Sequence, residues 1–296
     1  MSAAPAPTPA RSVLLPRRTE FTRLAAEEFL PPLFLSNEKE RNGMESELRA
    51  GERIDYVNDD ITLIQRTDGL IFGTDALLLA AFVRGNGRER AAELGSGSGI
   101  VSLLCAGRRK FSSIRCAEIQ PAYAELTDRN IRRNHMEDRV SVVCADVSEF
   151  ASAEKAGSFD VVFSNPPYLR ADCGRGSRTD EKNIARREVC GTIANFCRAA
   201  ARLLRFGGRF YCVYHAARLC DLLCAMRDAG IEPKRLTAVQ AHPMAQPSMI
   251  LAEGRAGGHP DCRITRPFCL FTDRTQKENT REMNRLLESG RLLLDE

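Results

Sequence analysis

The sequence predicts an α/β fold: a doubly wound, mostly parallel sheet of seven strands with an antiparallel edge, preceded by a small β-hairpin. Three observations support this prediction. Short apolar runs alternate with helical patterns from Arg90 onward, at the spacing that parallel strands with crossover helices require. The first run leads into the glycine-rich loop Gly95-Ser96-Gly97-Ser98-Gly99. The fourth run stops at Asn165-Pro166-Pro167-Tyr168, because proline cannot donate to a sheet ladder.

The first 43 of the 296 residues differ in composition from the remainder. The stretch from Ala3 to Ala10 is rich in alanine and proline, a low-complexity pattern that is typical of disorder. Met44 then opens a segment that resembles a natural beginning. We therefore expect residues 1–43 to be a disordered tail or a stretch upstream of the true start.

Residues 44–84 are predicted to form a hairpin and a helix that pack on the main domain. Arg53 to Tyr56 comes first in this segment. Thr67-Asp68-Gly69 is a hairpin turn signal, and it joins Ile61–Gln65 to Leu70–Phe72. A helix is expected to follow over Ala76 to Val83.

Residues 85–272 are predicted to be the sheet domain, and residues 273–296 a C-terminal helix or tail. The seven expected strands are Ala91–Leu94, Ile114–Glu118, Val140–Ala145, Phe159–Phe163, Arg209–Tyr214, Leu236–Gln240 and Met249–Glu253. The expected helices are Ile100–Ala106, Pro121–Asn134, Thr192–Leu204 (closed by Gly207-Gly208) and Ala216–Ala229. The last two strands should pair antiparallel, Phe268–Phe271 could add an edge, and Thr280–Leu294 is expected to be exposed.

Composition narrows the class of protein. The net charge of +4 permits a nucleic-acid partner without requiring one. The 11 cysteines form no C-x-x-C pair, and most lie in apolar runs, such as Cys105, Cys116, Cys144 and Cys212. They are predicted to be buried thiols in a reducing cytoplasm, and neither disulfides nor zinc ligands. No apolar run approaches transmembrane length, and the N-terminus lacks the apolar core of a signal peptide.

The glycine loop predicts a ligand site at the end of the first strand. Small residues let the backbone approach a ligand closely, and the N-terminus of the next helix attracts polar or anionic groups. A dinucleotide site would require the pattern G-x-G-x-x-G, but Ile100 stands at its last position. The loop therefore weighs against NAD.

Acidic residues stand at the ends of three successive predicted strands. Glu118 ends the second strand, where a carboxylate can accept from both hydroxyls of a ribose. Asp146, followed by Val147, ends the third and could accept from an adenine amine, while Glu93 on the first could face a ligand ammonium. Each acid alone could merely cap the following helix. Three of them beside a glycine loop favour a nucleoside-containing cofactor.

Asn165-Pro166-Pro167-Tyr168 is suited to holding a planar amino group. The residue before a proline is restricted to extended geometry, so this turn is stiff. The Asn165 amide oxygen and the Pro166 carbonyl offer two acceptors, and Tyr168 offers a ring for stacking on an attached base. A rigid surface turn is the alternative for the tetrapeptide taken alone.

Together these features, from Arg53 to Phe271, resemble the class I S-adenosylmethionine-dependent methyltransferases. The tetrapeptide resembles the motif of members that methylate adenine N6, guanine N2 or a glutamine amide. Glu93-Leu94-Gly95 stands where many relatives carry Asp-Leu-Gly. The resemblance implies a Rossmann-like sheet with S-adenosylmethionine as cofactor. The residues expected to bind this cofactor are Thr74, Asp75, Glu93, Gly95, Ser96, Gly97, Gly99, Glu118, Asp146, Val147 and Asn165; Thr74 or Asp75 could also cap the following helix.

The segment before the glycine loop narrows the acceptor. Arg53 to Tyr56 and Phe72 to Ala80 resemble the N-terminal region of the bacterial valine-tRNA adenine-N6 methyltransferase family. Ala185-Arg186-Arg187-Glu188 is similar to that family's Ala-Arg-x-Glu, and Thr74 stands where many relatives carry serine. The family methylates the adenine on the 3′ side of the anticodon in one valine tRNA. The resemblance therefore implies a tRNA partner, and we expect a cytoplasmic enzyme without a metal ion.

Catalysis is expected to rest on positioning by Asn165, Pro166, Pro167 and Tyr168. An anticodon-loop adenine is largely unpaired, so turning it outward costs little before it stacks on Tyr168. Asn165 and Pro166 would accept from the amino group and aim its lone pair at the methyl group. No general base is needed, so the four histidines are given no catalytic role. The basic residues expected to bind the tRNA backbone are Arg170, Arg175, Arg178, Arg186, Arg187, Lys234, Arg235 and Arg266.

Three alternatives stay open at this point. A glutamine amide methyltransferase acting on release factors would suit the tetrapeptide, but such enzymes carry a helical N-terminal domain where this chain shows a hairpin and one helix. Methylation of guanine N2 in ribosomal RNA is the second alternative. The third is an RNA chaperone that binds the cofactor without catalysis, against which the intact Asn165 and Tyr168 argue.

Overall fold

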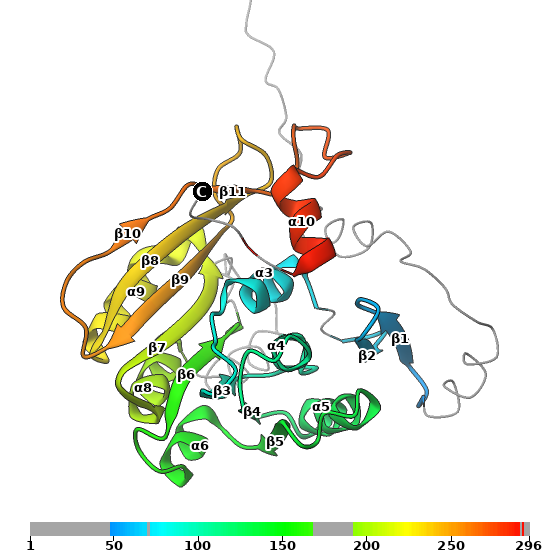
Figure 1. Ribbon diagram of the computed structural model, residues 1–296, viewed down its shortest axis with the longest axis vertical. Helices are drawn as coiled ribbons and strands as arrows, with labels where there is room; N and C mark the ends of the chain where they lie inside the picture. Colours follow the sequence, from blue (N-terminus) through cyan, green and yellow to red (C-terminus); the bar gives the residue numbers. More distant parts are fainter. Residues whose placement is uncertain (1–47, 70–71, 168–191, 291, 293–296) are drawn as a thin grey trace, which may run out of the picture. The chain divides into compact units, whose positions relative to one another are not determined.

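The computed structural model of the protein describes residues 48–69, 72–167, 192–290 and 292. These residues belong to one compact unit, Ser36–Glu296, which combines a central sheet with a two-stranded hairpin (Figure 1). The predictions for residues 1–43, for Tyr168 and for Arg170, Arg175, Arg178, Arg186 and Arg187 lie outside the described residues.

The central sheet has the strand order β5-β4-β3-β6-β7-β9-β8. Strands β3 to β7 are parallel to one another, and β9 runs antiparallel to both β7 and β8. This arrangement confirms the predicted fold class of seven strands with an antiparallel edge. The strands are β3 Arg90–Leu94, β4 Ser113–Glu118, β5 Val140–Cys144, β6 Phe159–Ser164, β7 Leu204–His215, β8 Ile231–Gln240 and β9 Met249–Ala256.

Two short strands pair with β8 at the edge of the sheet. β11, Phe268–Cys269, lies within the stretch that the sequence indicated, whereas β10, Arg263–Ile264, was not predicted. Both pair in parallel with β8, so nine strands among the described residues share the sheet.

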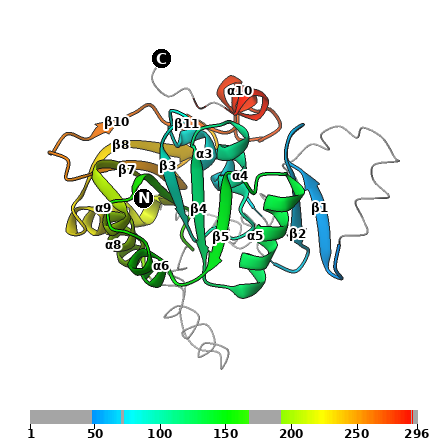
Figure 2. The same cartoon turned by 60° about the horizontal axis from the view of Figure 1, so that its bottom comes forward.

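Helices cover both faces of this sheet, as a parallel sheet requires. Side chains alternate along each strand, so Val161 and Phe163 pack in one core cluster and Val162 in the other. The first cluster includes residues of α3, α4 and α5, and the second includes residues of α6, α8 and α9 (Figures 1 and 2). The helices are α3 Thr74–Phe82, α4 Ile100–Gly107, α5 Pro121–Arg133, α6 Val147–Ala153, α8 Ile193–Leu203, η2 Ala216–Arg218, α9 Leu219–Asp228 and α10 Arg281–Ser289.

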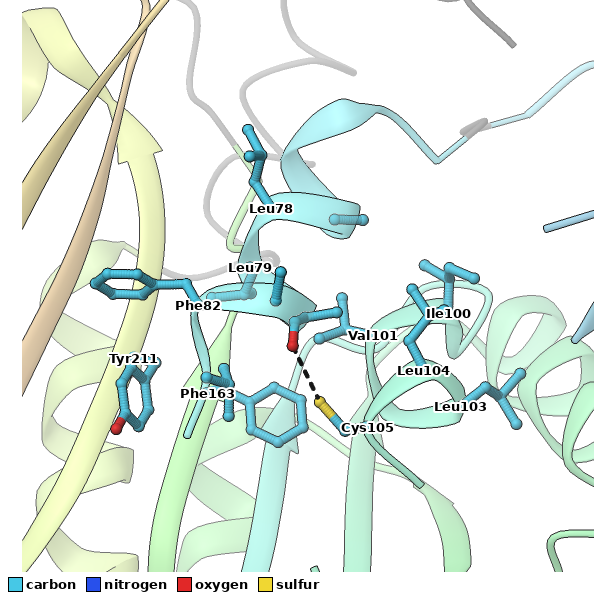
Figure 3. Close-up of a cluster of buried hydrophobic side chains, with 14 of the residues drawn as sticks. Leu78, Leu79, Phe82, Ile100, Val101, Leu103, Leu104, Cys105, Phe163 and Tyr211 are labelled. Atoms are coloured by element: carbon cyan, nitrogen blue, oxygen red, sulfur yellow. Dashed lines mark hydrogen bonds between the residues drawn. The ribbon is translucent and has the colours of Figure 1, made fainter. Parts of the chain in front are cut away.

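The first cluster fixes α3 to the sheet (Figure 3). Phe82 meets Tyr211 of β7 edge-to-face, with ring centroids 5.8 Å apart. Leu78 and Leu79 are fully buried, and the Cys105 thiol of α4 donates to the Ala80 carbonyl. Burying three such side chains typically contributes about 1.5–3 kcal/mol each, so α3 is held by packing rather than by its own propensity.

The N-terminal hairpin is present, but its pairing differs from the prediction. β1, Glu52–Tyr56, pairs antiparallel with β2, Thr62–Arg66. The turn lies at Asn58, whose side chain accepts from the backbone N–H groups of Asp60 and Ile61. The predicted turn at Thr67–Gly69 therefore follows the hairpin instead of closing it. The strand predicted to return from that turn, Leu70–Phe72, lies largely outside the described residues.

Three further features of the structure differ from the sequence predictions. Helix α6 was not predicted, although Asp146 and Glu149 form a capping box at its start. Gly207 and Gly208 lie inside the long strand β7 and do not close α8. Helix α10 is not simply exposed, because Met283 and Leu286 are buried in the first core cluster.

The cysteine thiols and the lengths of the helices can both be compared with the sequence predictions. The described cysteines are all free thiols, and Cys105, Cys116 and Cys212 are buried as predicted, whereas Cys144 is exposed because it ends the edge strand β5. Within the described part of the chain, none of the helices has the length and apolar character needed to traverse a bilayer.

Candidate functional site

The predicted site residues gather where the direction of the chain connections reverses. β3 lies between β4 on one side and β6 on the other. Ligands of open α/β sheets bind beyond the carboxyl ends of strands at such a switch point. The glycine loop follows β3, Glu118 ends β4 and Asn165 follows β6, so three elements distant in sequence meet at one edge.

The glycine loop has a backbone that only glycine adopts readily. Gly95, Gly97 and Gly99 have φ angles of 74°, 57° and 83°. The N–H groups of Gly95 and Ser96 donate to the Ala117 carbonyl of β4, at 2.8 and 3.2 Å. A Cβ atom at Gly97 would meet no atom within 4 Å. The loop is thus anchored on its inner side and presents bare backbone at Gly97, where a ligand can approach.

Glu118 connects β4 to this loop. Its Oε2 atom accepts from the Gly97 N–H at 2.9 Å, and its Oε1 atom accepts from the Gln120 N–H at 2.9 Å. Each carboxylate oxygen has a second lone pair, which can accept from a ligand hydroxyl. The buried Glu118 side chain therefore supports the loop and keeps acceptor capacity for a ribose.

Asp146 caps the helix that follows it, which was the alternative to a role in ligand binding. Its Oδ1 atom accepts from the Ser148 N–H at 2.8 Å, and Glu149 reaches back to the Asp146 N–H, so the pair caps α6. The cap fixes the side chain at the end of the loop after β5. Val147, the first residue of α6, is buried. These contacts leave a ligand role for Asp146 and Val147 as a prediction.

Glu93 is turned into the protein. It is 1% exposed, and its Oε2 atom accepts from both the N–H and the hydroxyl of Ser102 in α4. Burial raises the pKa of Glu93 to about 8, against the opposing effect of these hydrogen bonds. This geometry argues against the predicted contact with a ligand ammonium and makes Glu93 an internal support for the start of α4.

The raised pKa of Glu93 predicts a pH-dependent stability. Above pH 4.5 the unfolded chain releases this proton, whereas the folded protein holds it until about pH 8, so the free energy of unfolding falls as pH rises between them. Glu93→Gln keeps an oxygen for Ser102 without a titrating group. Relative to wild type, we expect the variant to gain up to about 3 kcal/mol between pH 5 and pH 7.5, measured by urea unfolding. A difference that does not change with pH would contradict the burial of a titrating carboxyl group.

The turn after β6 lies directly beside the glycine loop. Ser164 is in register with Leu94 of β3, and its hydroxyl donates to the Leu94 carbonyl at 2.7 Å. Asn165 is therefore adjacent to Gly95 across the two strands. Pro166 is buried and Pro167 is exposed, whereas Tyr168 lies outside the described residues.

Asn165 contacts the start of α3. Its Nδ2 atom donates to Asp75 Oδ2 at 2.9 Å, and Asp75 Oδ1 accepts from the Ala76 N–H at 2.9 Å. Gly73, rather than Thr74 or Asp75, occupies the N-cap position of α3, and no side chain caps it. The structure thus brings Asp75 to the turn that begins at Asn165 (the acceptor turn), a contact that the sequence did not predict.

Sequence reasoning also missed two polar residues on the buried face of α5. The Thr127 hydroxyl donates to the Gly97 carbonyl at 2.7 Å. The Asn130 amide donates to the carbonyls of Ile64 and Ser98, both at 3.0 Å, and accepts from the Ile64 N–H at 2.7 Å. Asn130 therefore connects the hairpin to the glycine loop. The sequence held a signal, because Thr127 and Asn130 are three residues apart on the helix face that carries Leu126 and Ile131, and polar groups on a buried face must find partners.

Asn134 provides a matched control for Asn130. It also bonds β2, through the Thr62 N–H and carbonyl, but does not reach the loop. We expect Asn130→Ala to lower the free energy of unfolding by about 2–3 kcal/mol and Asn134→Ala by about 1 kcal/mol, since only Asn130 is fully buried. In calorimetric titration with S-adenosylhomocysteine, only Asn130→Ala should weaken binding several-fold. Equal weakening by both variants would show that the hairpin acts as a whole.

The predicted nucleic-acid-binding residues fall into two groups where the structure describes them. Arg266 is exposed, and the half-buried Lys234 donates to the His259 carbonyl. Arg235 is 6% exposed, and its Nε atom donates to Glu253 Oε2 at 2.9 Å. The predicted RNA contact of Arg235 is therefore wrong: its guanidinium serves the core, stacked on Phe82 at 4.1 Å from the ring centroid.

No group of three or more His, Cys, Asp or Glu side chains arranged to bind a metal ion occurs among the described residues. The described site is instead built from backbone, carboxylates and one amide. It can hold a ligand with hydroxyl groups at Glu118 and present hydrogen-bond acceptors beside it at Asn165.

Comparisons with known proteins agree with this geometry. The Methyltransferase small domain family matches residues 67–224, more than half of the chain. A curated Porphyromonas gingivalis protein named tRNA1(Val) (adenine(37)-N6)-methyltransferase is 28% identical over 189 residues, covering 62% of this chain and 73% of that protein. An Enterobacter protein of the same name is 34% identical over 146 residues, covering 48% and 56%.

A solved structure shares the fold. The crystal structure of a predicted O-methyltransferase from Agrobacterium tumefaciens aligns with a TM-score of 0.60 at 19% identity, over 74% of this chain and 98% of that one. At this identity the likeness concerns the arrangement of the sheet and its helices alone.

Proposed function

The chain belongs to the methyltransferase small domain family and is an S-adenosylmethionine-dependent methyltransferase, and we propose that it methylates N6 of an adenine next to the anticodon of a tRNA, valine tRNA by resemblance. One observation carries the proposal: the turn Asn165-Pro166-Pro167 follows β6 directly beside the glycine loop, with the Asn165 amide held by Asp75. The names of the curated relatives support tRNA as the partner.

The described residues fit S-adenosylmethionine. The bare backbone at Gly97 leaves room for a ligand, and the lone pairs of Glu118 suit the two ribose hydroxyls. Asp146 and Val147 are proposed to take the adenine end, and Gly95, Ser96, Gly97 and Gly99 the methionine end. When bound, the cofactor supplies an electrophilic methyl group.

The acceptor turn is proposed to hold the target amine. The Asn165 Oδ1 atom and the Pro166 carbonyl accept from the amino group, which localises its lone pair and aims it at the methyl group. Pro167 stiffens the turn, and Tyr168 stacks on the base, a contact typically worth about 1–3 kcal/mol. The amine loses its proton after transfer, so these residues need only position it and no general base is required.

An anticodon-loop adenine suits such a site because it is already unstacked from a duplex. Turning it outward costs less than opening a base pair, so the turn can capture it with few contacts. The phosphates on either side require basic residues, which Lys234 and Arg266 could supply together with the five arginines between residues 170 and 187.

The proposal is tested by mapping where the methyl group goes. Purified protein is incubated with methyl-labelled S-adenosylmethionine and total tRNA from a strain that lacks its gene. Label should appear as N6-methyladenosine in the anticodon loop of one tRNA, and tRNA from the parent strain, already methylated, should accept little. Label in protein alone, or in guanine of ribosomal RNA alone, would replace the tRNA proposal by one of the two enzymatic alternatives.

A further inference from the structure

We propose that Asp75 is a positioning residue for methyl transfer, which holds the Asn165 amide in the one orientation that turns Oδ1 towards the acceptor amine. This inference rests on the proposed role of Asn165. It assigns to Asp75 an action through Asn165, in place of the cofactor contact that the sequence suggested.

The contact joins two elements that lie 90 residues apart in sequence. Asn165 Nδ2 donates to Asp75 Oδ2 at 2.9 Å. Asp75 is in the first turn of α3, and its other oxygen accepts from the Ala76 N–H at 2.9 Å. Both oxygens of the carboxylate are therefore engaged by donors, and the side chain is fixed relative to the helix.

An asparagine amide can be flipped about its last bond, which exchanges the oxygen and the NH₂ group. Only the oxygen can accept a hydrogen bond from an amine. A flipped Asn165 would instead turn its NH₂ group towards the target amine, so that two groups of hydrogen-bond donors would face each other. A carboxylate accepts and does not donate, so it selects the orientation with Nδ2 facing it. Oδ1, in the same amide plane, then points away from the carboxylate, towards the proposed position of the target amine.

Both partners are held on rigid supports. Lys110 Nζ donates to the Ala80 carbonyl near the end of α3 at 2.7 Å, and Leu78 and Leu79 of the same helix are fully buried (Figure 3). Ser164, just before Asn165, is tied to the Leu94 carbonyl. The orientation of one amide is thus set by two anchored elements, so a loss of the carboxylate should release the amide without moving the strand.

A double-mutant cycle tests this proposal. The variants are Asp75→Ala, Asp75→Asn, Asn165→Ala and the double Asp75→Ala/Asn165→Ala. We expect Asp75→Ala to lower kcat about 10- to 100-fold, while the Kd for S-adenosylhomocysteine changes less than about threefold. Asp75→Asn should fall between it and wild type, because its amide can accept from Asn165 but can also donate. The double variant should be no slower than Asn165→Ala.

Other outcomes would overturn the proposal. Additive losses in the double variant would show that Asp75 acts independently of Asn165. A raised Kd with kcat preserved at saturating cofactor would return Asp75 to the cofactor site. Asp221→Ala serves as the control, because Asp221 is also an aspartate in the first turn of a helix, α9, where it accepts from Arg218 just before that helix. Its kcat should match wild type.

A second measurement does not depend on the substrate. In nuclear magnetic resonance spectra of side-chain amides, one Nδ2 proton of Asn165 should exchange slowly with solvent in wild type and at least about tenfold faster in Asp75→Ala. Unchanged exchange would refute the contact. If wild type transfers no methyl group to tRNA, the proposed function fails, whereas the amide spectra still decide whether Asp75 orients Asn165.

Discussion

Replacing Asn165 by alanine should lower kcat at least about 100-fold while the Kd for S-adenosylhomocysteine stays within about threefold of wild type. Removing one preorganised hydrogen-bonding group at a reacting centre typically costs this much. Asn165 follows β6 beside the glycine loop, and its amide is oriented by Asp75. The amide is therefore placed to act on the acceptor, whereas the cofactor is proposed to be held mainly by the loop and Glu118.

The measurement compares single-turnover methylation of tRNA with calorimetric titration of S-adenosylhomocysteine. Asn86→Ala is the control, because Asn86 is likewise an asparagine with a hydrogen-bonded side chain, but it accepts from the backbone N–H groups of Arg88 and Glu89 and precedes β3 at the other end of the strand. It should behave as wild type. A variant of Asn165 that fails to bind S-adenosylhomocysteine would assign the residue to the cofactor instead.

The carboxyl ends of the strands could be predicted because their chemistry is local. Glu118 is the last residue of β4 and Asn165 comes directly after β6, and parallel strands bring such ends to one edge of a sheet. The glycine loop could also be predicted. Its three glycines have positive φ angles, which other residues rarely adopt, so glycine at alternate positions marks such a loop in the sequence. These positions needed only the strand pattern, and no knowledge of which strands are neighbours.

Contacts between distant segments could not be read in the same way. The Asp75–Asn165 bond depends on how α3 meets the end of β6, which no local pattern encodes. Arg235 illustrates the converse error, because a basic residue beside Lys234 has the same sequence pattern whether it is exposed or buried. Arg235 is buried because it lies opposite Glu253 on β9, and this register of the two strands is a property of the folded sheet.

Arg235 and Glu253 form a mostly buried ion pair at the antiparallel edge. The two residues face each other across β8 and β9, with 2.8 Å between Arg235 Nη2 and Glu253 Oε2. Burial lowers the pKa of Arg235, and Glu253 opposes this effect. Phe82 receives the guanidinium on its ring, so the pair also contacts α3. Removing the carboxylate alone would leave a buried cation without its counter-charge.

Glu253→Leu should therefore lower the free energy of unfolding by about 3–5 kcal/mol, the usual cost of breaking a buried pair from one side. For a chain of this size the loss corresponds to a fall in melting temperature of roughly 6–15 °C, measurable by calorimetry. Glu253→Gln keeps an acceptor for the guanidinium and should lose about half as much. The double variant Arg235→Met/Glu253→Leu removes both charges and should recover most of the loss, because apolar groups of similar volume can replace a buried pair. If the double variant melts as low as Glu253→Leu, the loss comes from packing around β9, and the counter-charge is not what Arg235 requires.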